Sequence, residues 1–165
     1  MAKITFKGNG VTTSGELPKK GSTAPAFSLT TQELEERSLE DFSGKKKILN
    51  IVPSLDTGVC AASAKTFEAR AHELADTVVI TVSKDLPFAQ HRFCQAEGID
   101  NVVTLSAFRS AEFGKDYGVE MQDGPLRGLL SRAVVVLDKN NKVVYTEQVP
   151  EIAQEPDYDA AVAAL

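Results

Sequence analysis

Hydrophobic residues follow two different periods along the chain, and the change between them predicts alternating strands and helices. Mostly apolar runs at residues 48–52, 78–82 and 102–105 are typical of strands that are covered on both faces. After the first run, apolar residues recur every three or four positions from Ala64 to Leu74, with charged residues between them. This spacing predicts an amphipathic helix that begins near Ala61.

A second helix is expected between the second and third apolar runs. Asp85 is suited to its N-cap, Pro87 to its first turn and Gly98 to the position just after its end, so the helix should run to Glu97. Shorter elements are expected as follows: a strand at residues 27–29, short helices at 38–42 and 111–117, and a final helix behind Asp157.

Two hairpins are predicted near the ends of the chain. Residues 3–7 and 11–13 flank the turn residues Gly8-Asn9-Gly10, and the first of these runs alternates polar and apolar side chains. Residues 133–137 and 142–148 flank Asp138-Lys139-Asn140-Asn141, which indicates a second antiparallel hairpin.

The order of the elements predicts an α/β protein with a thioredoxin-like fold. We expect a central mixed β-sheet flanked by helices on both faces, with an N-terminal β-hairpin extension. A flavodoxin-like doubly wound sheet also alternates strands and helices, but it would not end in a hairpin. The chain has 165 residues, which is enough for one sizeable core, and we expect residues 1–165 to form a single domain.

Charge and hydropathy narrow the possible partners. The net charge of −5 makes nucleic acid an unfavourable partner, because an acidic surface repels phosphate backbones. The N-terminal residues lack the apolar core of a signal peptide, and no apolar run approaches the length of a membrane span. We therefore expect a soluble cytoplasmic protein with no membrane association, if the sequence starts at the true N-terminus.

One of the two cysteines, Cys60, lies where the first apolar strand gives way to the amphipathic helix. The free N–H groups and the helix dipole at such a position stabilise an anion, so the thiolate of Cys60 should be favoured and reactive. A buried, inert thiol beside Ala61 and Ala62 is equally compatible with this position. The position alone leaves both interpretations open.

Other known uses of a thiol fit this sequence poorly. A dithiol exchanger needs Cys-x-x-Cys, but Thr57 stands where the partner cysteine would be. A Cys–His hydrolase needs a nearby base; His72 is three helical turns along the same helix, and His91 falls on a polar helix face. Two cysteines and two histidines at irregular spacing make no recognisable metal site.

The residues around Cys60 resemble a known motif. Pro53-x-x-x-Thr57-x-x-Cys60 is similar to the peroxidatic motif of the peroxiredoxins, with no departure at the motif positions. The resemblance extends to the bacterial thiol peroxidase subfamily (atypical 2-Cys peroxiredoxins) and covers nearly the whole chain. The segments that carry it are NIVPSLDTGVCAASAKTF, SKDLPFAQHRFCQAEGIDNVVTLSAFR, EFGKDYGV, DGPLRGLLSRAVVVLD and EPDYDAAVAAL.

This resemblance implies a peroxidase mechanism with no metal, flavin or haem cofactor. Cys60 would attack a hydroperoxide and become a sulfenic acid. Thr57 and nearby backbone N–H groups would hold the peroxide oxygens. Pro53 would shield the sulfenate from water, and Arg132, in the segment SRAVVV, matches the arginine that the family places beside the thiolate. Arg109 is a weaker candidate for a supporting role, and a simple surface role fits it equally well.

The same resemblance makes Cys94 the resolving thiol, which would form an intramolecular disulfide with Cys60. Thioredoxin would reduce this disulfide, and a homodimer is typical of the family. On its predicted helix Cys94 lies on the more polar side, because Ala89, Phe93 and Ala96 mark the apolar face. Both cysteines lie on helices, so we expect disulfide formation to unwind one or both helix ends locally.

Three functions remain open from the sequence. The first is a thioredoxin-dependent hydroperoxide reductase for antioxidant defence, which by the subfamily's leaning would favour alkyl and lipid hydroperoxides over hydrogen peroxide. The second is a redox sensor or holdase that uses the same disulfide switch without fast turnover. The third is a non-catalytic thioredoxin-like module with inert thiols.

Overall fold

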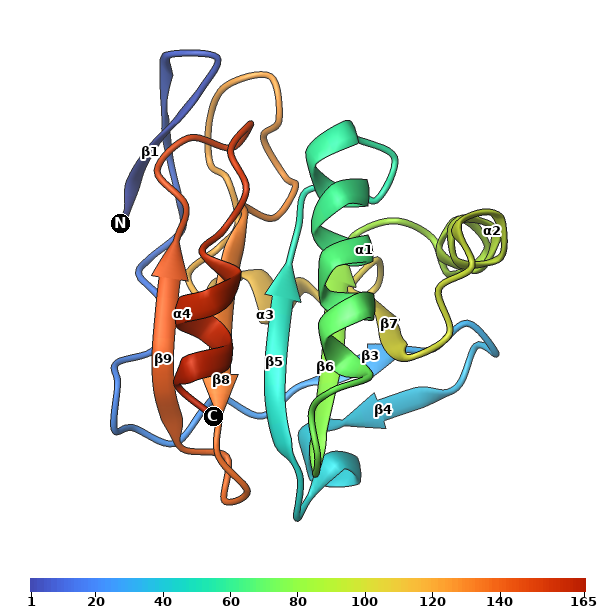
Figure 1. The fold of residues 1–165 in the computed structure, drawn as a ribbon. Helices are drawn as coiled ribbons and strands as arrows, with labels where there is room; N and C mark the ends of the chain where they lie inside the picture. The colour runs from blue at the N-terminus through green and yellow to red at the C-terminus, as the bar shows by residue number, and fades with distance from the viewer.

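A seven-stranded mixed sheet forms the centre of the protein in a computed structural model that describes residues 1–165 (Figure 1). Its strands are Ser28–Thr30 (β3), Glu36–Ser38 (β4), Lys46–Ile51 (β5), Thr77–Ser83 (β6), Val102–Ser106 (β7), Ala133–Leu137 (β8) and Val143–Gln148 (β9). They lie in the order β4-β3-β7-β6-β5-β8-β9. β5, β6 and β7 are parallel, whereas β8 is antiparallel to β5 and β9 is antiparallel to β8, which confirms the predicted mixed sheet.

Helices cover both faces of this sheet. They are a 3-10 turn at Leu39–Phe42 (η1) and α-helices at Gly58–Ala71 (α1), Pro87–Glu97 (α2), Ala111–Asp116 (α3) and Tyr158–Ala163 (α4). α1 and α4 lie side by side on one face (Figure 1), where Phe67 and Tyr158 make an edge-to-face aromatic contact. α3 covers the other face. No helix of the structure combines the length and the hydrophobicity that crossing a bilayer requires.

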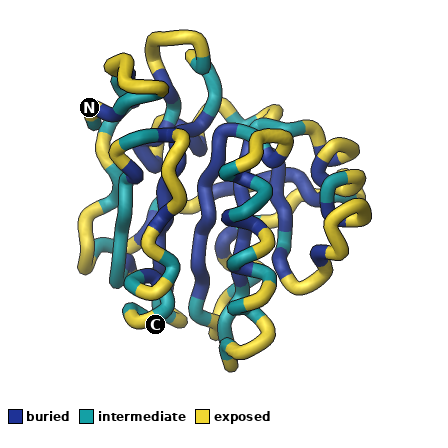
Figure 2. The backbone as a smooth tube through the Cα atoms, turned by 45° about the horizontal axis from the view of Figure 1, so that its top comes forward, coloured by how far each residue is buried: buried dark blue, intermediate teal, exposed yellow.

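The central strands are buried on both faces, as their continuous apolar runs predicted. Successive residues of a strand point to opposite sides of the sheet, so Ile48 belongs to the core beneath α1 and α4, whereas Leu49 belongs to the core on the α3 side. Figure 2 shows the buried strands as a dark blue centre, with exposed residues on the outer sides of the helices. The sheet therefore holds the loops at its carboxyl edge on a rigid support.

The N-terminal hairpin is confirmed, with its turn one position earlier than predicted. β1 (Lys3–Phe6) and β2 (Asn9–Thr12) are joined by Lys7-Gly8, both at positive φ, as a tight two-residue hairpin requires. The carboxylate of Glu151 accepts hydrogen bonds from the Thr5 hydroxyl and the Lys7 N–H. These bonds dock the hairpin on the segment after β9.

Three sequence predictions need correction. β4 was not predicted, because its residues Glu36-Arg37-Ser38 carry no apolar signal and the strand forms by pairing at the sheet edge. α1 begins at Gly58 rather than near Ala61, because Thr57 caps it. Asp85 is not the N-cap of α2: Leu86 occupies that position, and no side chain caps the helix.

Gly118 provides a test of the packing between the N-terminal segment and α3. It has φ +68°, and a Cβ there would lie 2.2 Å from the carbonyl oxygen of Glu16. Gly118→Ala is expected to lower the free energy of unfolding in urea by at least about 2 kcal/mol, through left-handed strain and the backbone clash together. Gly98→Ala is the matched control, because Gly98 has φ +67° and nothing within 4 Å of the added Cβ. Gly98→Ala should lower the free energy of unfolding by only about 1 kcal/mol. Equal losses in the two variants would show that the clash with Glu16 does not contribute.

Candidate active site

Cys60 lies in the first turn of α1 with its side chain completely buried. Apolar residues of β5 lead the chain to this point, and Pro53 ends the run just after the strand. The first-turn N–H groups of a helix have no partner within the helix, and together with the helix dipole they favour a negative charge. The structure therefore places the thiol at the strand–helix junction, as the hydrophobic pattern predicted.

Arg132 comes from the residue immediately before β8 and reaches Cys60 through the interior. Its side chain is only 2% exposed, and its Nη2 donates to Cys60 Sγ over 3.1 Å. Its Nε donates to the carbonyl of Ile152 over 2.7 Å, which fixes the plane of the guanidinium. A hydrogen bond from a charged donor stabilises a thiolate more than a thiol. The third nitrogen, Nη1, is buried and has no hydrogen-bond partner.

Thr57 is the N-cap of α1 and holds the first turn in place. Its hydroxyl oxygen accepts from the N–H of Cys60 over 3.4 Å, and its hydroxyl donates to the carbonyl of Ser54 over 3.2 Å. The hydroxyl is thus oriented from both sides, by the helix and by the preceding loop.

A cavity of about 250 Å³ adjoins these groups. Thr57 and Arg132 are among the residues that line it, and so is Pro53. The other large apolar residues that line it are Phe6, Val59, Leu126, Leu129 and Ile152. Phe6 belongs to the N-terminal hairpin, so segments from both ends of the chain shape this cavity.

Cys94 lies on α2 and is 7% exposed. The amide nitrogen of Gln32 lies 3.5 Å from Cys94 Sγ and donates to the Thr104 hydroxyl over 2.6 Å. Burial raises the pKa of the Cys94 thiol, and the hydrogen bond from Gln32 partly opposes this. In this state Cys94 is therefore a protected thiol.

The predicted orientation of α2 is wrong. Its buried residues are Pro87, Gln90 and Cys94. Of the three residues that we expected on the apolar face, Phe93 is partly buried against the core, whereas Ala89 and Ala96 are exposed. Gln90 can face the core because its amide donates to the Ser83 hydroxyl and to the Leu105 carbonyl. The helix therefore turns its cysteine inward.

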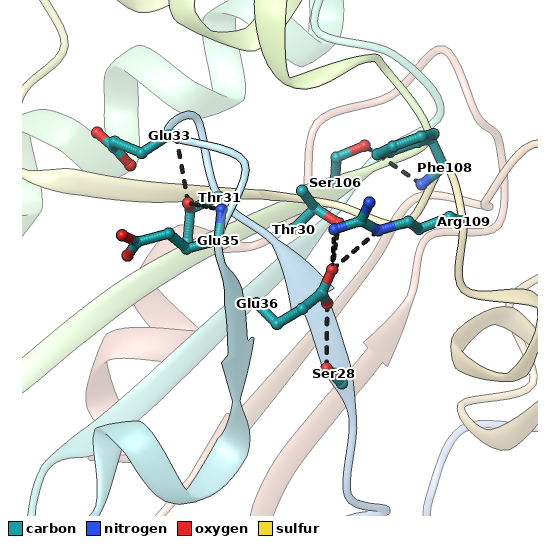
Figure 3. Close-up of polar contacts among 9 residues, drawn as sticks. All are labelled: Ser28, Thr30, Thr31, Glu33, Glu35, Glu36, Ser106, Phe108 and Arg109. Carbon is teal, nitrogen blue, oxygen red and sulfur yellow. Dashed lines mark hydrogen bonds and ion pairs between the residues drawn. The ribbon is translucent and has the colours of Figure 1, made fainter.

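Arg109 and the two histidines make no hydrogen bond to either cysteine. Figure 3 shows the Arg109 guanidinium facing the carboxylate of Glu36, with which it forms an exposed ion pair. His72 contacts Asn101 and His91 contacts Gln32, both at the surface. No group of three or more His, Cys, Asp or Glu side chains is placed to hold a metal ion.

Two residues at the redox centres were missed by the sequence patterns. Gln32 carries no signal because it lies in the polar turn between β3 and β4, far along the chain from Cys94. Phe6 was recognised only as part of an alternating strand, and nothing in that pattern indicates which segment the hairpin packs against.

Known proteins resemble this chain in sequence over its whole length. The Redoxin family matches residues 19–162. Thiol peroxidases of Corynebacterium glutamicum and Mycobacterium tuberculosis are 56% and 58% identical over 165 residues, which is 100% of this chain and 99% of each relative.

Solved structures agree with these matches. A peroxiredoxin-like protein from Aquifex aeolicus superposes with a TM-score of 0.93 at 40% identity, covering 99% of this chain and 95% of its own. A thiol peroxidase from Chromobacterium violaceum superposes with a TM-score of 0.91 at 25% identity, covering 98% of this chain and 93% of its own. The chain therefore belongs to the Redoxin family and, among the peroxiredoxins, to the thiol peroxidases.

Proposed function

We propose that this thiol-dependent peroxidase reduces hydroperoxides to alcohols or water through a sulfenic acid on Cys60. The contact between Arg132 and Cys60 carries the proposal. One guanidinium nitrogen already lies 3.1 Å from the sulfur, and a second is buried without a partner. A buried N–H group without an acceptor costs folding free energy. Its presence here is best explained if it donates a hydrogen bond to an oxygen of the substrate during the reaction.

The chemical step follows from these positions. The Cys60 thiolate attacks the terminal oxygen of the hydroperoxide; an S–O bond forms and the O–O bond breaks. Cysteine is oxidised to the sulfenic acid, and the leaving alkoxide or hydroxide takes a proton from solvent. Arg132 is the donor placed where negative charge develops on oxygen, and the Thr57 oxygen keeps one acceptor position that can receive the O–H of the hydroperoxide. Pro53 covers the sulfenate on the cavity side and limits its access to water.

Cys94 is then the resolving thiol. Its sulfur attacks the sulfenic sulfur of Cys60, a disulfide forms, and hydroxide leaves as water. Both thiols are buried on helices, so this step requires one or both helix ends to unwind locally. Crystal structures of the reduced and oxidised protein should differ in the helical turns around Cys60 and Cys94. Identical helices in both would contradict this step.

The cavity supports a preference for organic hydroperoxides over hydrogen peroxide. Its walls are mainly apolar, and burial of an alkyl group against them would contribute binding energy that hydrogen peroxide cannot obtain. We therefore assign alkyl and lipid hydroperoxides as the favoured substrates, with hydrogen peroxide as a further one.

Thioredoxin is the proposed reductant of the Cys60–Cys94 disulfide. A thioredoxin-dependent enzyme would work in the cytoplasm, where dithiol reductants keep such disulfides reduced.

A homodimer is also proposed. It is supported by exposed Leu86, Phe88 and Phe108 beside the loops after β6 and β7, where the Ser106 hydroxyl bonds to the carbonyl of Asp85. This bond brings the segments that carry Leu86 and Phe108 close together, and exposed apolar side chains on neighbouring segments favour a protein interface.

Consumption of NADPH with thioredoxin, thioredoxin reductase and cumene hydroperoxide tests the function. We expect sustained turnover by the wild type. Cys94→Ser should consume about one equivalent of hydroperoxide and then stop, because its sulfenic acid has no resolving partner. A sensor would form the disulfide without sustained turnover. A wild-type rate equal to the background without enzyme would contradict the proposed function.

A further inference from the structure

The loop that precedes Cys60 depends on one carboxylate from another part of the chain. Asp85 Oδ1 accepts from the Ser54 hydroxyl over 2.7 Å, and its Oδ2 accepts from the Leu55 N–H over 2.7 Å. Residues 53–57 make no other hydrogen bond to any part of the protein outside the loop and α1. Pro53 has no N–H to add one.

Asp85 is itself held firmly. The Ser83 hydroxyl at the end of β6 donates to its Oδ2 over 2.7 Å, and the Ser106 hydroxyl of β7 donates to its carbonyl. Two strands of the sheet therefore hold Asp85, β6 through its carboxylate and β7 through its backbone. A carboxylate that accepts three hydrogen bonds, one of them from backbone, holds its partners closely because charge-assisted bonds are stronger than neutral ones.

A continuous chain of contacts leads from Asp85 to the reacting sulfur. The carbonyl of Ser54 accepts a hydrogen bond from the Thr57 hydroxyl, and the Thr57 oxygen accepts one from the N–H of Cys60. Thr57 is exposed and has no other side-chain partner, so the position of its hydroxyl depends on where the Ser54–Leu55 backbone lies. We infer that Asp85 is a positioning residue for peroxide reduction, which sets the Thr57 hydroxyl and the first turn of α1 against Arg132.

The inference rests on the proposed peroxidase function and assigns a new role within the same site. Asp85→Asn keeps the size of the side chain but removes its charge. The amide oxygen can still accept from the Leu55 N–H, and the amide nitrogen can meet the Ser54 hydroxyl only as a donor, so both loop bonds lose their charge assistance and the loop is held less firmly. Displacement of reacting groups by about 1 Å lowers a reaction rate on the order of 100-fold. We expect the second-order rate constant of Cys60 with cumene hydroperoxide, in single turnover, to fall about 10- to 100-fold.

Asp56→Asn is the matched control, because it makes the same change in charge one residue from Thr57. The Asp56 carboxylate is exposed and makes no side-chain hydrogen bond, so this variant should react within about twofold of the wild type. Urea unfolding of each variant establishes that the comparison is made on folded protein. If Asp85→Asn does not fold, Ser54→Ala removes one of the same two bonds and should lower the rate by a smaller factor.

A double-mutant cycle separates positioning from general weakening of the fold. In a Thr57→Val background, Asp85→Asn should lower the rate constant less than threefold, because the hydroxyl that it positions is gone. An equal fall in both backgrounds, or an unchanged rate in Asp85→Asn, would overturn the role of Asp85. Absence of reaction in the wild type would instead contradict the peroxidase function, so the two failures are distinguishable.

Discussion

Cys60→Ser is expected to abolish hydroperoxide reduction, with a fall on the order of 10⁵-fold or more in the second-order rate constant. The attacking group is a thiolate, and a serine hydroxyl beside Arg132 remains protonated and cannot donate its electrons to a peroxide oxygen at a comparable rate. The measurement is single-turnover consumption of cumene hydroperoxide, with product alcohol determined by chromatography.

Loss of structure must be separated from loss of the nucleophile in this variant. Serine is close to cysteine in size and its hydroxyl can accept from Arg132, but its other neighbours are mainly apolar. A loss of about 1–3 kcal/mol in unfolding free energy would still leave the variant folded enough for the rate to be measured. Cys94→Ser serves as the matched control, since it removes the other thiol and retains the first turnover. A Cys60→Ser variant that still reduces peroxide at the wild-type rate would exclude Cys60 as the nucleophile.

Arg132→Lys is expected to lower the rate constant of Cys60 with hydroperoxide by about 10²- to 10³-fold. Lysine keeps the positive charge but is a single point donor. It cannot contact Cys60 Sγ, bond to the Ile152 carbonyl and offer a further donor to the substrate at the same time, as the guanidinium does. The affinity for a bulky hydroperoxide should change less, because the apolar walls of the cavity remain.

Arg109→Lys is the control for this substitution. Arg109 forms an exposed ion pair with Glu36, so the same change there should leave the rate constant within about twofold. Stopped-flow or quenched-flow reactions at several hydroperoxide concentrations separate binding from chemistry. Equal effects of the two substitutions would show that the geometry around Cys60 does not need a guanidinium.

Most strands and helices could be predicted because their signals are local. The apolar run of β5, the spacing of Ala64 and Phe67 on α1, and Pro87 with Gly98 around α2 each report a preference that the surrounding fold preserves. β4 lacked such a signal, since a polar edge strand forms only when its partner is present.

The predicted orientation of α2 was wrong for a related reason. Hydrophobicity placed Ala89 and Ala96 toward the core, but the hydrogen-bonding groups of Ser83 and Leu105 are there to receive Gln90. A buried polar side chain is stable wherever its partners are supplied, and those partners come from β6 and β7. The sequence pattern of a single helix does not contain that information.

Patterns along the chain were enough to predict the alternating architecture and the position of Cys60 at the start of a helix, and the resemblance of its motif supplied the residues that we propose face the peroxide. The three-dimensional arrangement was needed to show that Arg132 reaches the sulfur, that Cys94 is buried, and that Asp85 holds the loop before Cys60 rather than capping α2. The physical reason is that helix starts and apolar periods arise from neighbours along the chain. Contacts of a guanidinium or a carboxylate arise where the parallel and antiparallel strands of the sheet bring distant loops to one edge.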